Sequence, residues 1–449
     1  MNGRTLLSIL TAKAVLSLSK FLFKGGSSFP GKVALAMDPS VLFHVAKGIP
    51  VILITGTNGK TTTANLLAQV LVKEGYRVIH NATGANMYPG ITASFIDAFR
   101  FREKKKADFA VIEVDEANVK FITQVLEPKA MAITNLFRDQ LDRYGEVYTT
   151  LHKILEGVDL TKETLLVLNG DESLLGALSQ ENPKRYFGFS VFEEGGKELD
   201  QNADAKFCKV CQGPYAYDFV TYNHLGKFYC PHCGYKRPSL DVSVDALLET
   251  TPSSSTFVLD NERVTLPQGG LYNIYNALCA YTLARELGID KKRILSSFSV
   301  QESAFGRQEV LQMDQKEVHI FLVKNPAGYN QALDTVLLTK EAVTYAFLLN
   351  DQYADGRDVS WIFDVQFENL QGAVSGPLFI GGDRRYDMAV RLQTAGLDPE
   401  QFHVLDTYEA FTKALQKMAT EKIYIFATYT AMLGYRKHLH KLGYIKKLW

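Results

Sequence analysis

The chain has 449 residues, of which 46% are hydrophobic and 22% are charged, close to the average of folded soluble proteins. This length suits two or three domains with cores of their own, and the composition excludes a disordered chain. Lys and Arg total 49, as do Asp and Glu, so the formal net charge is zero and no global field attracts nucleic acid or an anionic membrane.

The N-terminal segment, residues 1–45, is predicted to be helical. Residues 6–23 are rich in Leu, Ile, Val and Phe, but Lys13 and Lys20 interrupt the run and no small-residue cleavage site follows. No apolar run reaches the length of a membrane-spanning helix. We expect an amphipathic helix that packs on the body of the protein, with contact to a membrane surface as the alternative.

Cysteine usage indicates a reducing compartment. Four of the five cysteines form two close pairs, and Cys279 stands alone in an apolar helical pattern, which does not suit a disulfide scaffold. We therefore expect a cytoplasmic protein, located at the inner face of the membrane if the N-terminal helix contacts it.

Residues 46–310 are predicted to form an α/β domain, because short apolar runs alternate there with helical patterns. The runs lack polar alternation, which is typical of strands buried on both faces of a parallel sheet; they cover residues 51–55, 76–80, 109–114, 130–134, 165–168 and 185–189. Residues 193–241 break the pattern and indicate an insertion. A strand over 254–259 and a helix over 272–287 follow.

Residues 311–449 are predicted to form a second, Rossmann-like α/β domain. The alternation restarts there, with a helical stretch over 386–394. The apolar runs expected to form its strands cover residues 318–323, 346–349, 378–380, 403–405 and 423–426.

A glycine-containing loop joins the first strand to the helix expected from about Ala64. Glycines allow consecutive backbone N–H groups to converge on phosphate oxygens, and the helix that follows adds its positive N-terminal dipole. In such loops the lysine reaches the terminal phosphates and the next hydroxyl can bind Mg²⁺. The predicted phosphate-binding residues are Gly56, Thr57, Asn58, Gly59, Lys60, Thr61 and Thr62.

Ile54 stands where the general form of this motif has glycine, and the shorter form resembles that of the Mur ligase family, which includes the folylpolyglutamate synthetases. Further segments resemble the family's motifs in the same order: T-N at 134–135, D-Q-L-D-R-Y-G at 139–145, N-G-D at 169–171, G-L-Y-N-I-Y-N-A at 270–277 and F-G-R-Q-E at 305–309. The resemblance implies a central P-loop ATPase domain and ATP-dependent ligation. A carboxylate would attack the γ-phosphate, and an amine would open the acyl phosphate.

The same resemblance implies roles for single residues. Lys60 and Thr61 would serve the phosphates and Mg²⁺, and Asn273 and Arg307 would contact the nucleotide. Glu113 ends an apolar strand at the edge where ligands collect in open α/β sheets, so we expect it to be a further Mg²⁺ ligand. The neighbouring acids at 115 and 116 compete for this role, and a solvated acidic turn is the alternative.

Three features depart from the family pattern. Residues 321–326 read F-L-V-K-N-P, so Lys324 replaces a family histidine. The lysine that many relatives carbamylate has no clean counterpart, since Lys153 is one residue out of step. The phosphate loop begins at residue 56, which leaves too little preceding chain for a UDP-binding domain, and the substrate therefore need not be a UDP-sugar peptide.

The paired cysteines predict a structural zinc ribbon over about residues 200–240. Cys208 and Cys211 form one C-x-x-C knuckle, and Cys230 and Cys233 form a second one 18 residues further on. Four thiolates at this spacing can surround a tetrahedral Zn²⁺ with no open position. His232 as a ligand and a redox dithiol are the alternatives, and nucleic-acid binding is not expected because acidic and aromatic residues are mixed with the local lysines.

An acidic turn, N-D-Q-Y-A-D-G-R-D at 350–358, follows the strand at 346–349, where either a site or a solvated Asp-Gly turn is expected. With this turn, the paired cysteines and G-G-D-R at 381–384, the chain resembles those members of the family that act as ligase subunits together with a glutamine amidotransferase. The resemblance implies that the α-carboxylate of D-glutamate in the lipid II stem peptide is amidated to D-isoglutamine. Asp355 would complete the partner's Cys–His pair across the interface of a heterodimer.

Three other functions remain open at this stage. A stand-alone ligase that adds an amino acid would work without a partner. A nucleic-acid-binding zinc-ribbon NTPase would hydrolyse ATP with a steep salt dependence. A scaffold with an inactive site would bind no ATP.

Overall fold

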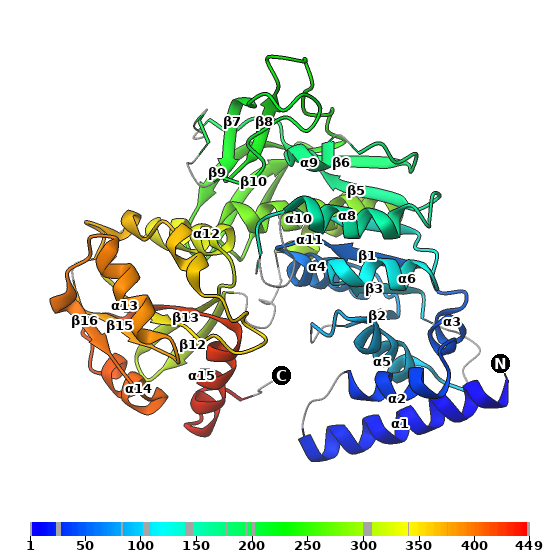
Figure 1. Ribbon diagram of the computed structural model, residues 1–449, viewed down its shortest axis with the longest axis horizontal. Coiled ribbons are helices and arrows are strands. Elements are labelled where there is room, and N and C mark those ends of the chain that lie inside the picture. The colour runs from blue at the N-terminus through cyan, green and yellow to red at the C-terminus, as the bar shows by residue number, and fades with distance from the viewer. Residues whose placement is uncertain are drawn as a thin grey trace.

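The computed structural model describes residues 2–23, 28–81, 84–101, 107–139, 147–176, 178–193, 196, 198–199, 203–299, 308–339, 341–374 and 376–446. It contains a large sheet, a smaller sheet and a separate hairpin (Figure 1). Among the described residues, none of the helices combines the length and the hydrophobicity needed to cross a membrane.

The large sheet has nine strands in the order β11-β10-β9-β6-β5-β4-β1-β3-β2. The strands from β2 to β9 are parallel, whereas β10 and β11 run antiparallel to their neighbours, so the sheet is mixed rather than wholly parallel. Strands β9 and β11 were not predicted because polar residues interrupt their apolar pattern. The strands are β1 (Val51–Thr55), β2 (Val78–His80), β3 (Phe109–Glu113), β4 (Ala130–Ile133), β5 (Leu165–Asn169), β6 (Lys184–Phe189), β9 (Val242–Thr250), β10 (Ser255–Leu259) and β11 (Glu262–Leu266).

Helices cover both faces of the large sheet. Successive side chains of a strand point to opposite faces, and in β1 Ile52 and Ile54 join one core while Leu53 joins the other. The first core includes α4 (Lys60–Lys73), α10 (Leu271–Glu286) and α11 (Lys291–Phe298). The second includes α5 (Tyr88–Ala98), α6 (Val119–Thr123), α8 (Val147–Val158) and α9 (Ser173–Gly176), and the 3₁₀ helix η1 (Glu116–Asn118) precedes α6.

Three N-terminal helices extend the second core at the lower right of Figure 1: α1 (Gly3–Phe23), α2 (Phe29–Met37) and α3 (Val41–Ala46). Ile9 and Ala12 of α1 are fully buried, as expected for a helix that packs on the body of the protein. The expectation of an amphipathic helix is wrong, however. Leu7 and Leu18 lie on the opposite side of α1 and are exposed, so both sides of the helix are apolar.

The insertion after β6 forms a two-stranded sheet of its own, although Phe219, Tyr222 and Leu225 of this sheet join the first core. It contains an antiparallel hairpin, β7 (Ala216–Tyr222) and β8 (Leu225–Tyr229), at the top of Figure 1, which was not predicted. Its small core consists of aromatic residues and two cysteines: Cys208, Tyr215, Tyr217, Phe228 and Cys230. So small an apolar cluster gives little hydrophobic stabilisation by itself.

The smaller sheet has the order β12-β13-β17-β14-β15-β16, parallel except for β12, and has helices on both faces. It is therefore Rossmann-like, as expected. Its strands are β12 (Glu309–Met313), β13 (Lys316–Leu322), β14 (Val343–Leu348), β15 (Leu378–Gly381), β16 (Phe402–Val404) and β17 (Lys422–Ala427). Its helices are α12 (Pro326–Leu337), η2 (Ser360–Asp364), η3 (Phe367–Leu370), α13 (Arg385–Thr394), η4 (Pro399–Gln401), α14 (Tyr408–Gln416) and α15 (Tyr429–Lys441).

Candidate nucleotide site, cysteine cluster and acidic turn

The phosphate loop lies between β1 and α4, and α4 begins at Lys60, four residues before the predicted start. Gly56 and Gly59 have φ angles of 117° and 85°, in the region that favours glycine. A Cβ at Gly59 would lie 2.0 Å from Oδ1 of Asn276, and one at Gly56 would lie 2.5 Å from Oγ1 of Thr134. Only glycine therefore fits at these two positions.

The T-N segment after β4 holds the loop in place. The side-chain Oδ1 of Asn135 accepts a hydrogen bond from the backbone N–H of Asn58 at 2.9 Å, and the Thr134 hydroxyl donates to the carbonyl of Asn58 at 2.6 Å. The backbone N–H of Thr57 donates to the carbonyl of Asn135 at 2.9 Å. These contacts give the loop a fixed shape, which lowers the cost of ordering it around a ligand.

Lys60 is 8% exposed and is held by partners within the site. Its Nζ donates to the carbonyl of Gly56 at 2.6 Å and to Oε1 of Glu116 at 2.7 Å. Although burial opposes the charge, the carboxylates of Glu116 and Glu113 raise the pKa of Lys60 above its ordinary value. Lys60 is therefore a fixed cation beside the loop.

The three acids after β3 have different partners. The hydroxyl of Thr61 donates to Oε2 of Glu113 at 2.8 Å, and the Asn86 amide donates to Oε1 of Glu113 at 3.1 Å. Glu116 pairs with Lys60, and Asp115 accepts from the backbone N–H of Ala117 at the start of η1. Thus Glu113 is the acid that lies against the predicted Mg²⁺-binding hydroxyl.

A pocket opens beside the loop, between the large sheet and the C-terminal domain. Its lining includes Asn58, Asn135, Tyr222, Asn273, Asn276 and Asn325. Asn58 and Asn325 exchange side-chain hydrogen bonds of 3.2 and 3.0 Å, which tie the loop to the start of α12. The predicted nucleotide contact Asn273 thus lines this pocket, whereas Arg307 lies outside the described residues.

Several residues of this site were not predicted. Lys324 pairs with Asp139 at 2.5 Å, which links the C-terminal domain to the segment after β4. Tyr222 reaches the pocket from the insertion, and Gln308 donates to the hydroxyl of Tyr272 at 2.6 Å. Asp139, Tyr272 and Gln308 lie in the family-like motifs and Lys324 departs from one, but no motif indicated these contacts. The acidic pattern marked Glu116 as a candidate metal ligand rather than as a partner for Lys60.

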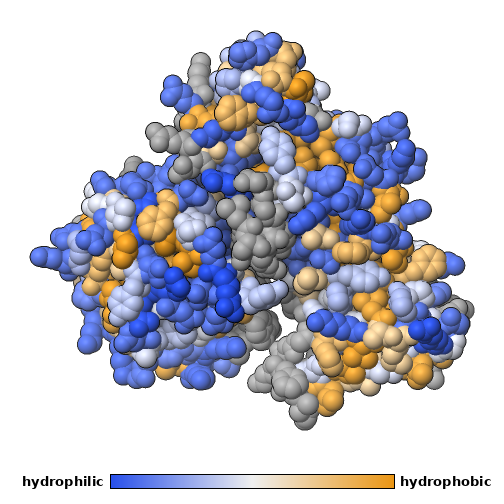
Figure 2. Space-filling model, viewed as in Figure 1, coloured by the Kyte–Doolittle hydropathy of each residue, from blue (hydrophilic) through white to orange (hydrophobic). Residues whose placement is uncertain are grey.

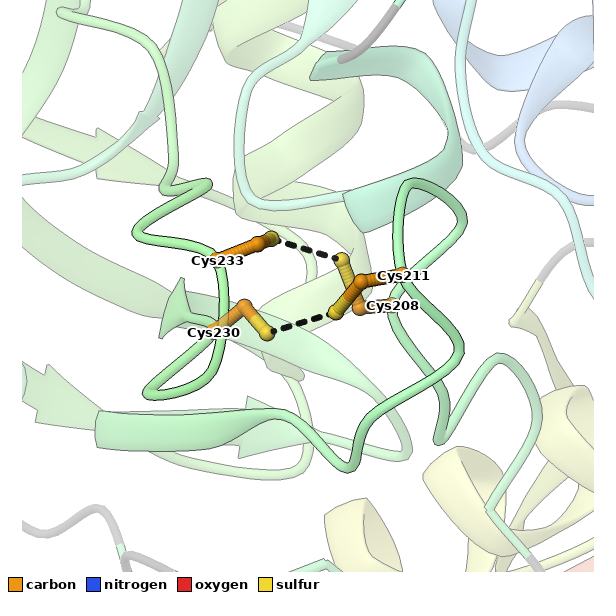
Figure 3. A group of neighbouring side chains, drawn as sticks. All are labelled: Cys208, Cys211, Cys230 and Cys233. Atoms are coloured by element: carbon orange, nitrogen blue, oxygen red, sulfur yellow. Dashed lines mark hydrogen bonds between the residues drawn. The ribbon is translucent and has the colours of Figure 1, made fainter.

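The four paired cysteines converge from two knuckles (Figure 3), with all four Sγ atoms within 4.8 Å of one another. Sγ of Cys208 lies 3.7 Å from that of Cys233, and Sγ of Cys211 lies 3.4 Å from that of Cys230. Tetrahedral Zn–S bonds of ~2.3 Å place their sulfurs ~3.8 Å apart, so the cluster fits such an ion closely. Among the described residues, this is the one group of three or more His, Cys, Asp or Glu side chains close enough together to hold a metal ion.

Two largely buried pairs of ionisable side chains join the insertion to the large sheet. Arg237, just after the second knuckle, donates to Oδ1 of Asp171 at 2.6 Å, and the Tyr275 hydroxyl donates to Oδ2 of Asp171 at 2.7 Å. Nε2 of His224 lies 2.7 Å from Oε2 of Glu172, and both side chains are fully buried. Burial lowers the pKa of His224, but the carboxylate of Glu172 outweighs it and raises that pKa.

The acidic turn follows β14, and Asp355 within it is 4% exposed. Its Oδ1 accepts from the backbone N–H of Thr430 at 2.8 Å, and its Oδ2 accepts from the Thr430 hydroxyl at the start of α15. Burial raises the pKa of Asp355, and the hydrogen bonds from Thr430 oppose this effect. Asp355 is therefore a buried carboxylate that caps α15.

Comparison with solved structures supports the fold. A pseudomurein peptide ligase type C from Methanothermus fervidus matches with a TM-score of 0.67 and 21% identity, over 90% of this chain and 81% of that one. MurF ligase from Thermotoga maritima, solved in complex with ADP, matches with a TM-score of 0.61 and 12% identity, over 91% and 85% of the two chains. The chain therefore has the fold of the Mur ligases.

Sequence comparison identifies the family within this class to which the chain belongs. Residues 54–230 match the model of the Mur ligase middle domain, and residues 322–432 match that of the MurT ligase C-terminal domain. The subunit MurT of the glutamine-hydrolysing lipid II isoglutaminyl synthase of Streptococcus pneumoniae is 38% identical over 448 residues, covering 100% of this chain and 99% of that protein. The Staphylococcus aureus subunit of the same name is 33% identical over 91% of this chain and 92% of its own length. The chain belongs to the MurT family of Mur ligase-like subunits.

Proposed function

We propose that this chain is the ligase subunit of a glutamine-hydrolysing lipid II isoglutaminyl synthase. In this reaction, ATP phosphorylates the α-carboxylate of D-glutamate in the lipid II stem peptide, and ammonia displaces the phosphate to leave D-isoglutamine. The similarity to two MurT subunits over nearly their whole length carries the proposal. The reaction places the chain in the cytoplasm, where nucleotide and a reducing environment occur together.

The phosphate loop has the parts that the first step requires. The N–H groups at the start of α4 and the charge of Lys60 would hold the triphosphate, and Asn273 would contact the nucleotide from the pocket. Thr61 and Glu113, whose oxygens lie 2.8 Å apart, would hold Mg²⁺, which stabilises negative charge on the transferred phosphoryl group. We assign the nucleotide contact at Arg307 by the same motif.

We further propose that the domains divide at about residues 45 and 310. The N-terminal helical segment (1–45) precedes the ATP-binding domain (46–310), and the C-terminal α/β domain (311–449) completes the pocket. Asn58 and Asn325 hydrogen-bond across the second boundary, so a movement of one of these domains relative to the other would break their hydrogen bonds.

The cysteine cluster would hold a structural Zn²⁺. The sulfur spacing fits the ion, and the small aromatic core beside it gives the insertion little stability of its own. We expect about one equivalent of zinc in the purified chain, and loss of zinc in Cys208→Ser with a lower melting temperature. The variant Cys279→Ala alters the fifth cysteine, which is buried in α10, and should keep its zinc. Equal zinc content in both variants would contradict this assignment.

The C-terminal domain would bind the glutaminase subunit, a glutamine amidotransferase of the GatD type. Around the acidic turn, Tyr353 and Tyr386 expose 79% and 63% of their surface, as suits residues that a partner covers. Arg384 lies 3.2 Å from Asp351, so α13 and the turn present a common surface. We propose that Asp355 orients the partner's catalytic histidine across this interface.

An assay of the two-subunit complex tests the function. Lys60→Ala should abolish ATP-dependent amidation of lipid II and leave glutamine hydrolysis nearly unchanged, because Lys60 serves only the phosphates. Lys120→Ala, which breaks a surface ion pair with Glu156, is the matched control and should retain amidation. Efficient addition of a free amino acid by the isolated chain would instead identify a stand-alone ligase and overturn the proposal.

A further inference from the structure

The outward side of α1 carries a leucine stripe made of Leu6, Leu7, Leu10, Ala14 and Leu18. These positions follow the i, i+3, i+4 spacing of one helix face, and the four leucines are 40%, 58%, 49% and 57% exposed. Figure 2 shows hydrophobic residues on this lobe, at the lower right of the view. A leucine-rich face without a charged residue is unusual on a helix in contact with water, where polar side chains are the rule.

The other side of α1 packs against the rest of the protein. Ser8 donates to the carbonyl of Ala34 at 2.9 Å, and the Thr5 hydroxyl donates to Asp38 at 2.5 Å, while Ile9 is fully buried. These two hydrogen bonds fix α1 on α2 and on Asp38, which follows α2, so the leucine stripe faces outward. Because this packing sets the orientation of α1, the stripe is presented on a rigid support.

The N-terminal layer is basic although the chain is neutral overall. Residues 2–47 contain six Lys or Arg residues and a single acid, Asp38. Asp38 is buried and accepts hydrogen bonds from Thr5 and Ser40, so it is turned away from the surface. The remainder of the chain carries the compensating negative charge. Apolar side chains and basic charge on one layer are the combination that anionic bilayers attract.

We propose that the leucine stripe of α1 rests on the surface of an anionic lipid bilayer, to which the net positive charge of residues 2–47 attracts it. None of the described helices is able to span a membrane, so the contact is interfacial. A second copy of the chain suits the stripe less well, because five aliphatic side chains bury too little area for a stable dimer and two basic layers would repel each other. The proposal does not rest on the proposed function, although a lipid-linked substrate would be reached from this position.

Vesicle sedimentation of the full chain, without nucleotide or lipid II, tests the contact. We expect binding to vesicles of phosphatidylcholine with about one-third phosphatidylglycerol, weaker binding to phosphatidylcholine alone, and weakening by salt. The triple variant Leu7→Gln, Leu10→Gln and Leu18→Gln should bind anionic vesicles at least tenfold more weakly. The matched control, Leu160→Gln with Leu248→Gln, changes leucines that are 52% and 50% exposed elsewhere and should bind as the unmodified chain does.

The outcomes separate the alternatives. Melting temperatures of both variants close to that of the unmodified chain show that folding is intact. Equal vesicle binding by the triple variant and the control overturns the proposal, as does the absence of any binding by the unmodified chain. A dimer in sedimentation velocity that the triple variant converts to a monomer would assign the stripe to a second copy. Because no substrate is present, failure here leaves the amidation assay unaffected.

Discussion

The phosphate loop and the acidic turn occupy equivalent places, since each follows the carboxyl end of a parallel strand inside its sheet. The loop after β1 is fixed by residues from two other segments, with Thr134 and Asn135 bonded to it and Asn276 packed against Gly59. The turn after β14 is fixed mainly by its own side chains: the carboxylate of Asp355 binds the start of α15, and the Asn350 amide donates to the Thr430 hydroxyl and accepts from the backbone N–H of Asp383. The first site is held largely through its backbone, and the second through several side chains that include the one proposed to act.

This difference has a consequence for function. In the phosphate loop, a change at Glu113 leaves the contacts of the loop with Thr134 and Asn135 in place, so chemistry can be lost without loss of the fold. In the acidic turn, Asp355 serves both the cap of α15 and the proposed contact with the partner. Variants of the turn therefore have to separate the two roles.

The largest effect is expected from Asp355→Asn. If the carboxylate orients the partner's histidine, glutamine hydrolysis by the complex should fall about 10³–10⁴-fold. The stability of the chain should fall by about 0.5–2 kcal/mol as the cap of α15 weakens. Steady-state glutaminase assays and thermal unfolding measure the two effects.

Thr430→Val provides the control for this variant. It removes the hydroxyl that bonds to Asp355 and should lower stability by a similar amount, but it should change hydrolysis only a few-fold. An unchanged rate of glutamine hydrolysis in Asp355→Asn would overturn the proposal that Asp355 orients the partner's catalytic histidine. Equal losses of hydrolysis in the two variants would assign the effect to the fold of the turn.

Glu113→Gln should lower the amidation rate about 10²–10³-fold, because the carboxylate proposed to bind Mg²⁺ is replaced by a neutral amide. Its melting temperature should change little, since Gln can still accept the hydrogen bond from Thr61. Glu156→Gln, on the surface of α8, is the matched control. A variant of Glu113 that unfolds would show that the loop, like the turn, depends on its acid for stability.

A smaller effect is expected from Glu116→Gln, which tests how Lys60 is held. The carboxylate of Glu116 pairs with Lys60 and adds negative charge beside the phosphate position. Its neutralisation should tighten ATP binding about fivefold, corresponding to ~1 kcal/mol. Isothermal titration calorimetry without Mg²⁺ measures this change, and weaker binding would indicate that Glu116 positions Lys60 for the nucleotide.

The smallest effect is expected from Asn58→Ala, which removes the reciprocal side-chain hydrogen bonds to Asn325. Neutral hydrogen bonds contribute about 1 kcal/mol each, so KM for ATP should rise only a few-fold while the melting temperature stays nearly constant. A large fall in stability would mean that the loop depends on the C-terminal domain as strongly as the turn depends on α15.

Much of the fold was predictable because its strands are buried on both faces. Uninterrupted apolar runs marked β1, β3 and β4 almost to the residue. Strands with one exposed side, such as β9, and the hairpin of β7 and β8 alternate or mix polar residues and were missed. The sequence of α1 likewise did not show which of its two apolar faces packs against the protein, because both faces carry similar residues.

The site was predictable to the extent that its residues are neighbours along the chain. Lys60 follows Gly59 directly and the cysteines come in close pairs, so local spacing revealed the phosphate loop and the cysteine cluster. No local pattern indicates that Glu116 pairs with Lys60, that Asn325 meets Asn58, or that Tyr222 reaches the pocket from the insertion.

The order of amino acids by itself determined the α/β class, the glycines that let the backbone curve around phosphates, and the thiolates available to a metal. Only the tertiary structure decided that Glu113, rather than its acidic neighbours, lies against Thr61, that Asp355 is buried beneath Thr430, and that the leucines of α1 face outward. The physical reason is that backbone conformation and ligand type depend on nearby residues, whereas the partner and burial of a side chain depend on segments that only folding brings together.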